Sequence, residues 1–127
     1  MGAIRVNLPA RPGSARDARD RLGSLLGSWP NDTARDDAML LLSEIVTNAV
    51  RHAHGETILL TLTTTDRRLR AEVHDESASP PTPRPSDETG GLGLLLVDQL
   101  SDRWGVDQHQ GDGKTVWFEI GTCRLRP

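Results

Sequence analysis

Three polar side chains recur four residues apart near the middle of the chain: Glu44, Asn48 and His52. Residues four apart lie on neighbouring turns of an α-helix, so a carboxylate, an amide and an imidazole would form one row along it. Such a row can meet a single ligand. The alternative is that the row is the solvated flank of an amphipathic helix, where glutamate is an ordinary helix former.

Asp75 is a second candidate, because it ends a run of alternating residues that reads as a strand. Alternate residues face the same side of a strand, so Asp75 would share the inward side of Leu69, Ala71 and Val73. A carboxylate directed into the interior needs a hydrogen-bond partner there. The alternative is an aspartate that ends the strand and caps the following turn.

A third candidate is the glycine-rich segment Gly90-Gly91-Leu92-Gly93-Leu94, which opens a predicted helix. Glycines at a helix start let the backbone approach a phosphate, and the free amides with the helix dipole form an anion site. The alternative is a flexible beginning of an ordinary helix. The preceding residues, 76–90, hold half of the chain's eight prolines. We therefore predict an exposed loop there that serves as a lid or a binding segment.

Apolar periodicity predicts the elements that would position these side chains. Helical spacing predicts helices over residues 14–26, from about 33 to 54, and from 90 to 100. The middle helix would bury a stripe made of Met39, Leu42, Val46, Ala49, Val50 and Ala53. Alternating segments predict strands over residues 3–8, 57–65, 68–75, 103–107 and 114–120. This order indicates an α+β fold, a two-layer sandwich with a mostly antiparallel, mixed sheet and three helices on one face.

Composition narrows the class of protein. At 127 residues the chain has the length of one domain, which we expect to span 1–127. A net charge of −3, with acids and bases interspersed, gives no basic surface for direct nucleic-acid binding. The single cysteine, Cys123, cannot form an internal disulfide and suits a reducing compartment. Because neither a membrane span nor a signal peptide is recognisable, we expect a cytoplasmic protein with no membrane partner.

Four motifs together carry a family resemblance. They are Glu44-x-x-x-Asn48-Ala49-x-x-His52, Asp75, Gly91-x-Gly93-Leu94 and Gly113-Lys114-Thr115, in this order. Over residues 30–121 the chain resembles the ATP-binding superfamily of gyrase, heat-shock chaperone, histidine kinase and MutL. Within this superfamily, the short length of the chain and the residues of its motifs are similar to those of anti-sigma-factor serine kinases of the sporulation and general-stress type.

The resemblance implies a histidine-kinase-like ATPase fold with ATP and Mg²⁺ as cofactors. Asn48 would give its amide oxygen to Mg²⁺, and Asp75 would accept a hydrogen bond from the adenine amine. Thr115 would support the adenine side. Glu44 would be the catalytic base that takes a proton from the attacking hydroxyl.

The same resemblance assigns the remaining nucleotide contacts. His52 would contribute to the nucleotide site, and the helix start formed by Gly91, Leu92, Gly93 and Leu94 would hold phosphate. Residues 76–90 would be the ATP lid.

The implied activity is transcription regulation by a serine/threonine-protein kinase. Such a protein binds a sigma factor, phosphorylates that factor's antagonist, and commonly pairs as a homodimer. One departure opens an alternative: the adenine motif reads Asp75-Glu76-Ser77-Ala78-Ser79, without the family's glycines. The alternative is a nucleotide-dependent binding module that switches a partner without transferring phosphate. Intact Glu44 and Asn48 favour the kinase, and the missing glycines favour the binding module.

Overall fold

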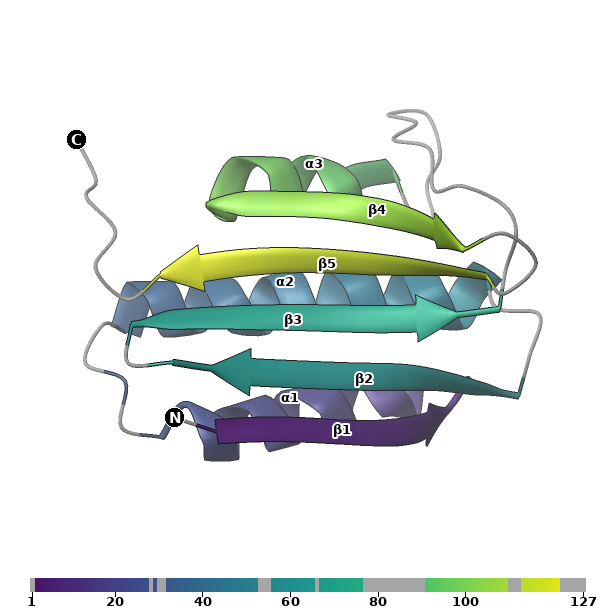
Figure 1. Ribbon diagram of the computed structural model, residues 1–127, viewed down its shortest axis with the longest axis horizontal. Helices are drawn as coiled ribbons and strands as arrows, with labels where there is room; N and C mark the ends of the chain where they lie inside the picture. Colours follow the sequence, from purple (N-terminus) through teal and green to yellow (C-terminus); the bar gives the residue numbers. More distant parts are fainter. Residues whose placement is uncertain are drawn as a thin grey trace.

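The computed structural model describes residues 2–27, 29, 32–52, 56–65, 67–76, 91–109 and 113–121. In these ranges the chain forms two layers, a five-stranded sheet and three helices that cover one of its faces (Figure 1). The strands are β1 (Gly2–Pro9), β2 (Thr57–Thr64), β3 (Arg68–Asp75), β4 (Arg103–His109) and β5 (Gly113–Gly121). The helices are α1 (Gly13–Leu25), α2 (Asp32–His52) and α3 (Gly91–Leu100). The predicted α+β sandwich is confirmed, and the element boundaries lie within a few residues of those predicted.

The sheet has the strand order β1-β2-β3-β5-β4, and each neighbouring pair is antiparallel. The sequence predicted a mostly antiparallel, mixed sheet, and the described strands contain no parallel pair. β3 and β4 do run in the same direction, and the connection between them contains α3. They are not neighbours, however, because β5 returns between them and pairs with both.

Alternation along each strand directs one row of side chains into the layer between the sheet and the helices. The buried rows are Ile58, Leu60, Leu62 and Thr64 in β2, Leu69, Ala71, Val73 and Asp75 in β3, and Lys114, Val116, Phe118 and Ile120 in β5. These rows meet apolar residues of all three helices in one core. None of the described helices combines the length and the apolarity needed to cross a bilayer.

α2 buries a wider face than the sequence predicted. Of the predicted stripe, Leu42, Val46 and Ala49 are buried, and Met39 and Val50 are partly buried. Ala53 lies outside the described residues. Further residues are buried as well, namely Ala34, Ala38, Leu41 and Ile45. The face is wide because α2 packs against α1 on one side, α3 on the other, and β3 and β5 beneath it.

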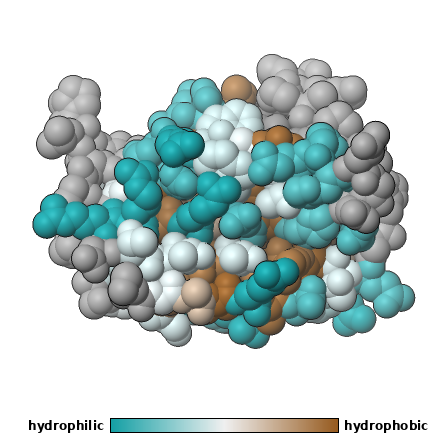
Figure 2. All heavy atoms as spheres, viewed as in Figure 1, coloured by the Kyte–Doolittle hydropathy of each residue, from teal (hydrophilic) through white to brown (hydrophobic). Residues whose placement is uncertain are grey.

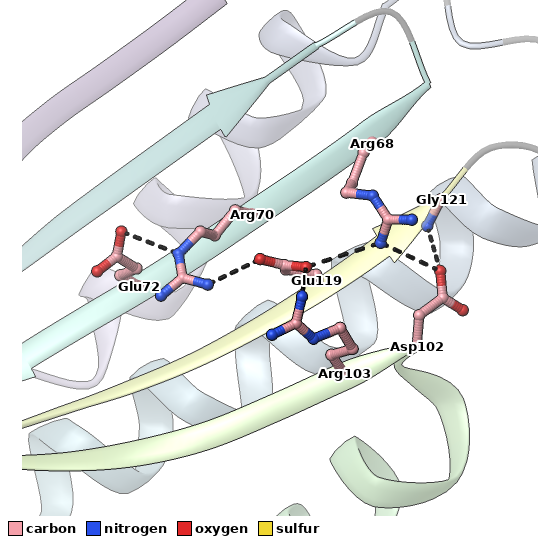
Figure 3. A network of polar contacts seen from close by, with 7 residues as sticks. All are labelled: Arg68, Arg70, Glu72, Asp102, Arg103, Glu119 and Gly121. Carbon is pink, nitrogen blue, oxygen red and sulfur yellow. Dashed lines mark hydrogen bonds and ion pairs between the residues drawn. The ribbon is translucent and has the colours of Figure 1, made fainter.

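The other face of the sheet is not covered by any described helix, and it is the face shown in Figure 2. Hydrophilic residues dominate it, and apolar surface is visible mainly in the lower half, over β1 and β2. On this face Glu119 of β5 lies among three arginines (Figure 3), at 2.8 Å from Arg70, 3.6 Å from Arg103 and 3.7 Å from Arg68. The Arg70 guanidinium also lies 4.1 Å from the centre of the Trp117 ring.

The charge of Arg70 is stabilised by this arrangement. Burial opposes the charged form, but the hydrogen bond to Glu119 and the nearby carboxylate of Glu72 outweigh burial. The pKa of Arg70 is therefore raised above its ordinary value. Because these residues come from β3 and β5, the contacts tie the two strands together across the open face.

The start of β5 approaches the end of β3 so closely that only glycine fits. Gly113 has a φ of +83°, in the left-handed region that other residues rarely adopt. A Cβ at this position would overlap the carbonyl oxygen of Asp75. Gly113 therefore allows the register that pairs Asp75 with Lys114.

We predict that Glu119→Ala lowers the free energy of unfolding by about 1.5–3 kcal/mol, because three guanidinium groups lose a largely buried carboxylate. The matched control is Asp17→Ala, which removes a carboxylate from an exposed pair with Arg21 within α1. That change should cost about 0.5 kcal/mol or less. Urea denaturation of both variants measures the difference, and equal losses would contradict the structural role of Glu119.

We predict that Gly113→Ala lowers the free energy of unfolding by at least about 2 kcal/mol, because the new methyl group strains the backbone where β5 meets β3. Gly13→Ala serves as the control, since Gly13 begins α1 and has nothing within 4 Å of its added Cβ. Its effect should stay within about 1 kcal/mol. Thermal and chemical denaturation distinguish the two, and a harmless Gly113→Ala would refute the close approach.

Candidate functional site

Most of the predicted site segments lie at one end of the molecule. α2 and β3 end there, and α3 and β5 begin there, at the right-hand side of Figure 1. The reason is topological: α2 and β3 run toward this end, whereas α3 and β5 run away from it. Segments that are far apart in the sequence are thus brought together where the ends of helices and strands meet.

The polar row on α2 is graded in exposure. Glu44 and Asn48 are half-buried, and His52, in the last turn, is exposed. Their neighbours Ile45 and Ala49 belong to the buried face of the helix. Glu44 and Asn48 therefore lie at the margin of the packed face and not on a fully solvated flank.

The position of this part of α2 is fixed from the side of α1. The Arg19 guanidinium of α1 donates a hydrogen bond of 2.9 Å to the Ser43 hydroxyl, one residue before Glu44. Packing of α2 against α3, β3 and β5 holds the helix over the sheet. The row of Glu44, Asn48 and His52 therefore lies on a well-packed helix, and residues that contact a ligand are positioned most precisely on such an element.

Asp75 faces inward, as the alternation predicted. It is 1% exposed and continues the buried row of Leu69, Ala71 and Val73 at the end of β3. The sequence predicted which side of the strand Asp75 faces, but it did not predict which residue lies beside the carboxylate.

Lys114 lies beside it. The register pairs Asp75 with Lys114, and the Lys114 Nζ is 3.6 Å from Asp75 Oδ1. The lysine side chain is 4% exposed, so both charges of the pair are buried. Sequence reasoning assigned no role to Lys114, although it has the same parity as Val116 and Phe118 and could have been placed inward on that ground.

Thr115 is not brought to Asp75. As the next residue after Lys114, it points to the opposite face of the sheet, where it is paired with His74 of β3. The family resemblance implied that Thr115 supports the adenine side, and this stays a prediction. In the structure Thr115 and Asp75 lie on opposite faces of the sheet, because Thr115 follows Lys114 and neighbouring residues of a strand face opposite ways. Lys114 is the residue of the Gly113-Lys114-Thr115 motif that accompanies Asp75.

On the open face, Thr115 is held between two histidines that the sequence analysis did not single out. Its hydroxyl lies 3.1 Å from His74 Nδ1 and 2.9 Å from His109 Nε2. A shallow pocket of about 430 Å³ is lined there by Arg5, Leu59, Thr61, Glu72, His74, His109 and Thr115. Within the described ranges, no group of three or more histidine, cysteine or acidic residues is placed to hold a metal ion.

The glycine motif begins α3 as predicted. Gly91, Leu92, Gly93 and Leu94 form its first turn, which contains no acidic residue. The amide end of the helix is therefore not neutralised by a carboxylate of its own first turn, and it can attract an anion. The predicted lid, residues 76–90, lies outside the described residues except for Glu76.

Comparison with known proteins identifies the family and the fold. The sequence matches the family described as histidine kinase-like ATPase domain over residues 8–120. A curated relative, an anti-sigma F factor of Clostridium acetobutylicum, is 31% identical over 94 residues, covering 64% of this chain and 66% of the relative.

Solved structures share the fold. The crystal structure of the RsbU and RsbW domains of a Mycobacterium tuberculosis protein matches with a TM-score of 0.72 at 24% identity, covering 100% of this chain and 34% of that chain. A histidine kinase domain from Erythrobacter litoralis matches with a TM-score of 0.56 at 20% identity, covering 94% of this chain and 68% of that chain. This chain thus spans just under two thirds of the curated relative and about a third of the mycobacterial chain. The family match covers most of the sequence, and the chain belongs to the histidine kinase-like ATPase domain family.

Proposed function

We propose that this protein is an ATP-binding bacterial regulator that acts as an anti-sigma factor. It binds a sigma factor and phosphorylates a serine or threonine of that factor's antagonist protein. The observation that carries the proposal is the buried Asp75 at the end of β3, at the same end of the molecule as the α2 row and the beginning of α3. The relative from Clostridium acetobutylicum, named an anti-sigma F factor, supports the choice of a sigma factor as partner.

The residues at this end suit ATP with Mg²⁺ in their chemistry. The Asn48 amide oxygen is a ligand of the hard type that Mg²⁺ prefers. The backbone amides that begin α3 suit phosphate, and the Asp75 carboxylate can accept a hydrogen bond from an exocyclic amine. When bound, ATP supplies the phosphoryl group and Mg²⁺ neutralises the charge that develops on it.

Glu44 has a separate role in the proposal. It stands one turn before Asn48 on the same row and is half-buried, so its carboxylate lies near the group that Asn48 holds. We infer that Glu44 accepts the proton of the attacking hydroxyl and that Asn48 positions the phosphate for attack.

Two observations favour a second function, a binding module that switches a partner without phosphate transfer. The adenine motif after Asp75 has no glycine, and the Asp75 carboxylate is paired with Lys114. Both features alter the residues around the proposed nucleobase position, whereas Glu44 and Asn48 of α2 are retained. In either version the proposal comprises a single domain over 1–127 with residues 76–90 as the lid, acting in the cytoplasm as a homodimer.

We predict that Asn48→Ala weakens the binding of ATP by about ten- to a hundred-fold in the presence of Mg²⁺, because one oxygen ligand of the cation is lost. ATP binding without Mg²⁺ should change little. Thr47→Ala is the control, since Thr47 is the exposed preceding residue on the same helix. Isothermal titration calorimetry with and without Mg²⁺ tests this, and wild-type Mg-ATP affinity in Asn48→Ala would remove Asn48 from the site.

We predict that Glu44→Gln binds Mg-ATP with nearly wild-type affinity but transfers phosphate about a hundred- to ten-thousand-fold more slowly, because an amide cannot take up the proton. Glu56→Gln, which changes an exposed carboxylate outside α2, should leave the rate unchanged. The assay uses labelled ATP and the antagonist protein that co-purifies with the chain. Wild-type transfer by Glu44→Gln would show that Glu44 is not the base. Absence of transfer by the wild type would replace the kinase with the binding module.

A further inference from the structure

The ion pair of Asp75 and Lys114 places an ammonium group at the carboxylate to which the proposed function assigns the nucleobase. The two side chains are 1% and 4% exposed, and Lys114 Nζ lies 3.6 Å from Asp75 Oδ1. The pair is therefore part of the interior of the site and not a surface contact. Lys114 is also the only lysine of the chain, among 15 lysine and arginine residues in total.

The backbone fixes Lys114 in this place. Asp75 and Lys114 are direct partners in the β3–β5 ladder, and Gly113 is in close contact with the Asp75 backbone. Lys114 also shares the inward parity of Val116 and Phe118. The register fixes the backbone of Lys114, and the strand directs its side chain inward. A base bound at Asp75 therefore meets the ammonium group, which lies 3.6 Å from the carboxylate.

The chemistry of the two groups differs in a way that matters for recognition. An ionised carboxylate only accepts hydrogen bonds, and an ammonium group only donates them. A carboxylate that faces position 6 of a purine favours an amino group there. It disfavours a 6-oxo group at the same place, because two acceptors would then face each other in a buried position.

With Lys114 at 3.6 Å, the site offers both an acceptor and a donor. The 6-amino group of adenine can donate a hydrogen bond to the Asp75 carboxylate. The 6-oxo group of guanine or hypoxanthine can accept one from the Lys114 ammonium, while the neighbouring ring N–H donates to Asp75. A compact ammonium with three rotatable donors suits this double use better than the fixed fork of a guanidinium group.

We propose that Lys114 is a specificity-determining residue that extends the site from 6-aminopurine to 6-oxopurine nucleotides. GTP and ITP then bind with affinities within about tenfold of that of ATP. The inference rests on the proposed function, which assigns the nucleobase to Asp75.

The test measures the dissociation constants of Mg-ATP, Mg-GTP, Mg-ITP and Mg-CTP for the wild-type chain by calorimetry. The expected result is similar affinity for the three purine nucleotides and weaker binding of CTP. Lys114→Met, which keeps length and removes the donor, should lose at least about a hundredfold in affinity for GTP and ITP and less than about tenfold for ATP. Lys114→Arg, which keeps a cationic donor, should retain part of the GTP binding.

A second measurement does not depend on the variants folding. Because Lys114 is the only lysine, ¹⁵N-lysine labelling gives one side-chain ammonium signal in the wild-type chain. GTP and ITP should shift this signal more than ATP does, since only the 6-oxo group accepts from it. An equal shift with CTP would mean that the signal reports phosphate binding, which overturns the assignment of the ammonium to the base.

The outcomes separate the two proposals. If the wild type binds ATP and rejects GTP and ITP by about a hundredfold or more, the inference about Lys114 is wrong and the proposed function stands. If Lys114→Met folds and keeps its GTP binding, Lys114 is not the determinant. If the wild type binds no nucleotide, the proposed function fails, and the inference fails with it.

Discussion

The ladder between β3 and β5 is the constraint on which the rest of the structure depends. Its register pairs Asp75 with Lys114 and His74 with Thr115, so it decides which side chains face the helices and which face the open side. A shift of β5 by one residue would turn its side chains over, place Lys114 on the open side and leave Asp75 without this partner. The close contact at Gly113 and the arginine contacts of Glu119 lie at opposite ends of this ladder, and both favour the observed pairing.

This register also explains why a sequence motif divides between two surfaces. The three adjacent residues make different contacts. Gly113 packs against the β3 backbone, and Lys114 forms an ion pair with Asp75. Thr115 forms hydrogen bonds with two histidines on the other face. A motif on a strand therefore cannot deliver all of its side chains to one ligand. The Asp75–Lys114 pair and the pocket at Thr115 lie on opposite faces of one sheet.

Much of the fold followed from local patterns in the sequence. The parity of Asp75 was predictable because β3 alternates regularly, and the helix at Gly91 was predictable from its glycines and the apolar run behind them. The contacts that these residues make could not be predicted from the sequence, since strand register depends on contacts between distant segments. The pairing of Asp75 with Lys114 and the two histidines beside Thr115 are contacts of this type. The wide buried face of α2 could not be predicted either, because it reflects simultaneous contacts with two helices and the sheet.

The strand order has a consequence for how the protein reaches its native state. β5 is made after β4 but occupies the place between β3 and β4, so β3 keeps an unpaired edge until β5 has been synthesised. Until then β3 is paired with β2 alone, and the Asp75 carboxylate lacks its cross-strand partner Lys114. Long-range pairing of this kind slows folding and exposes strand edges to association with other chains. The insertion of β5 therefore completes the core and the Asp75–Lys114 pair in a single late step.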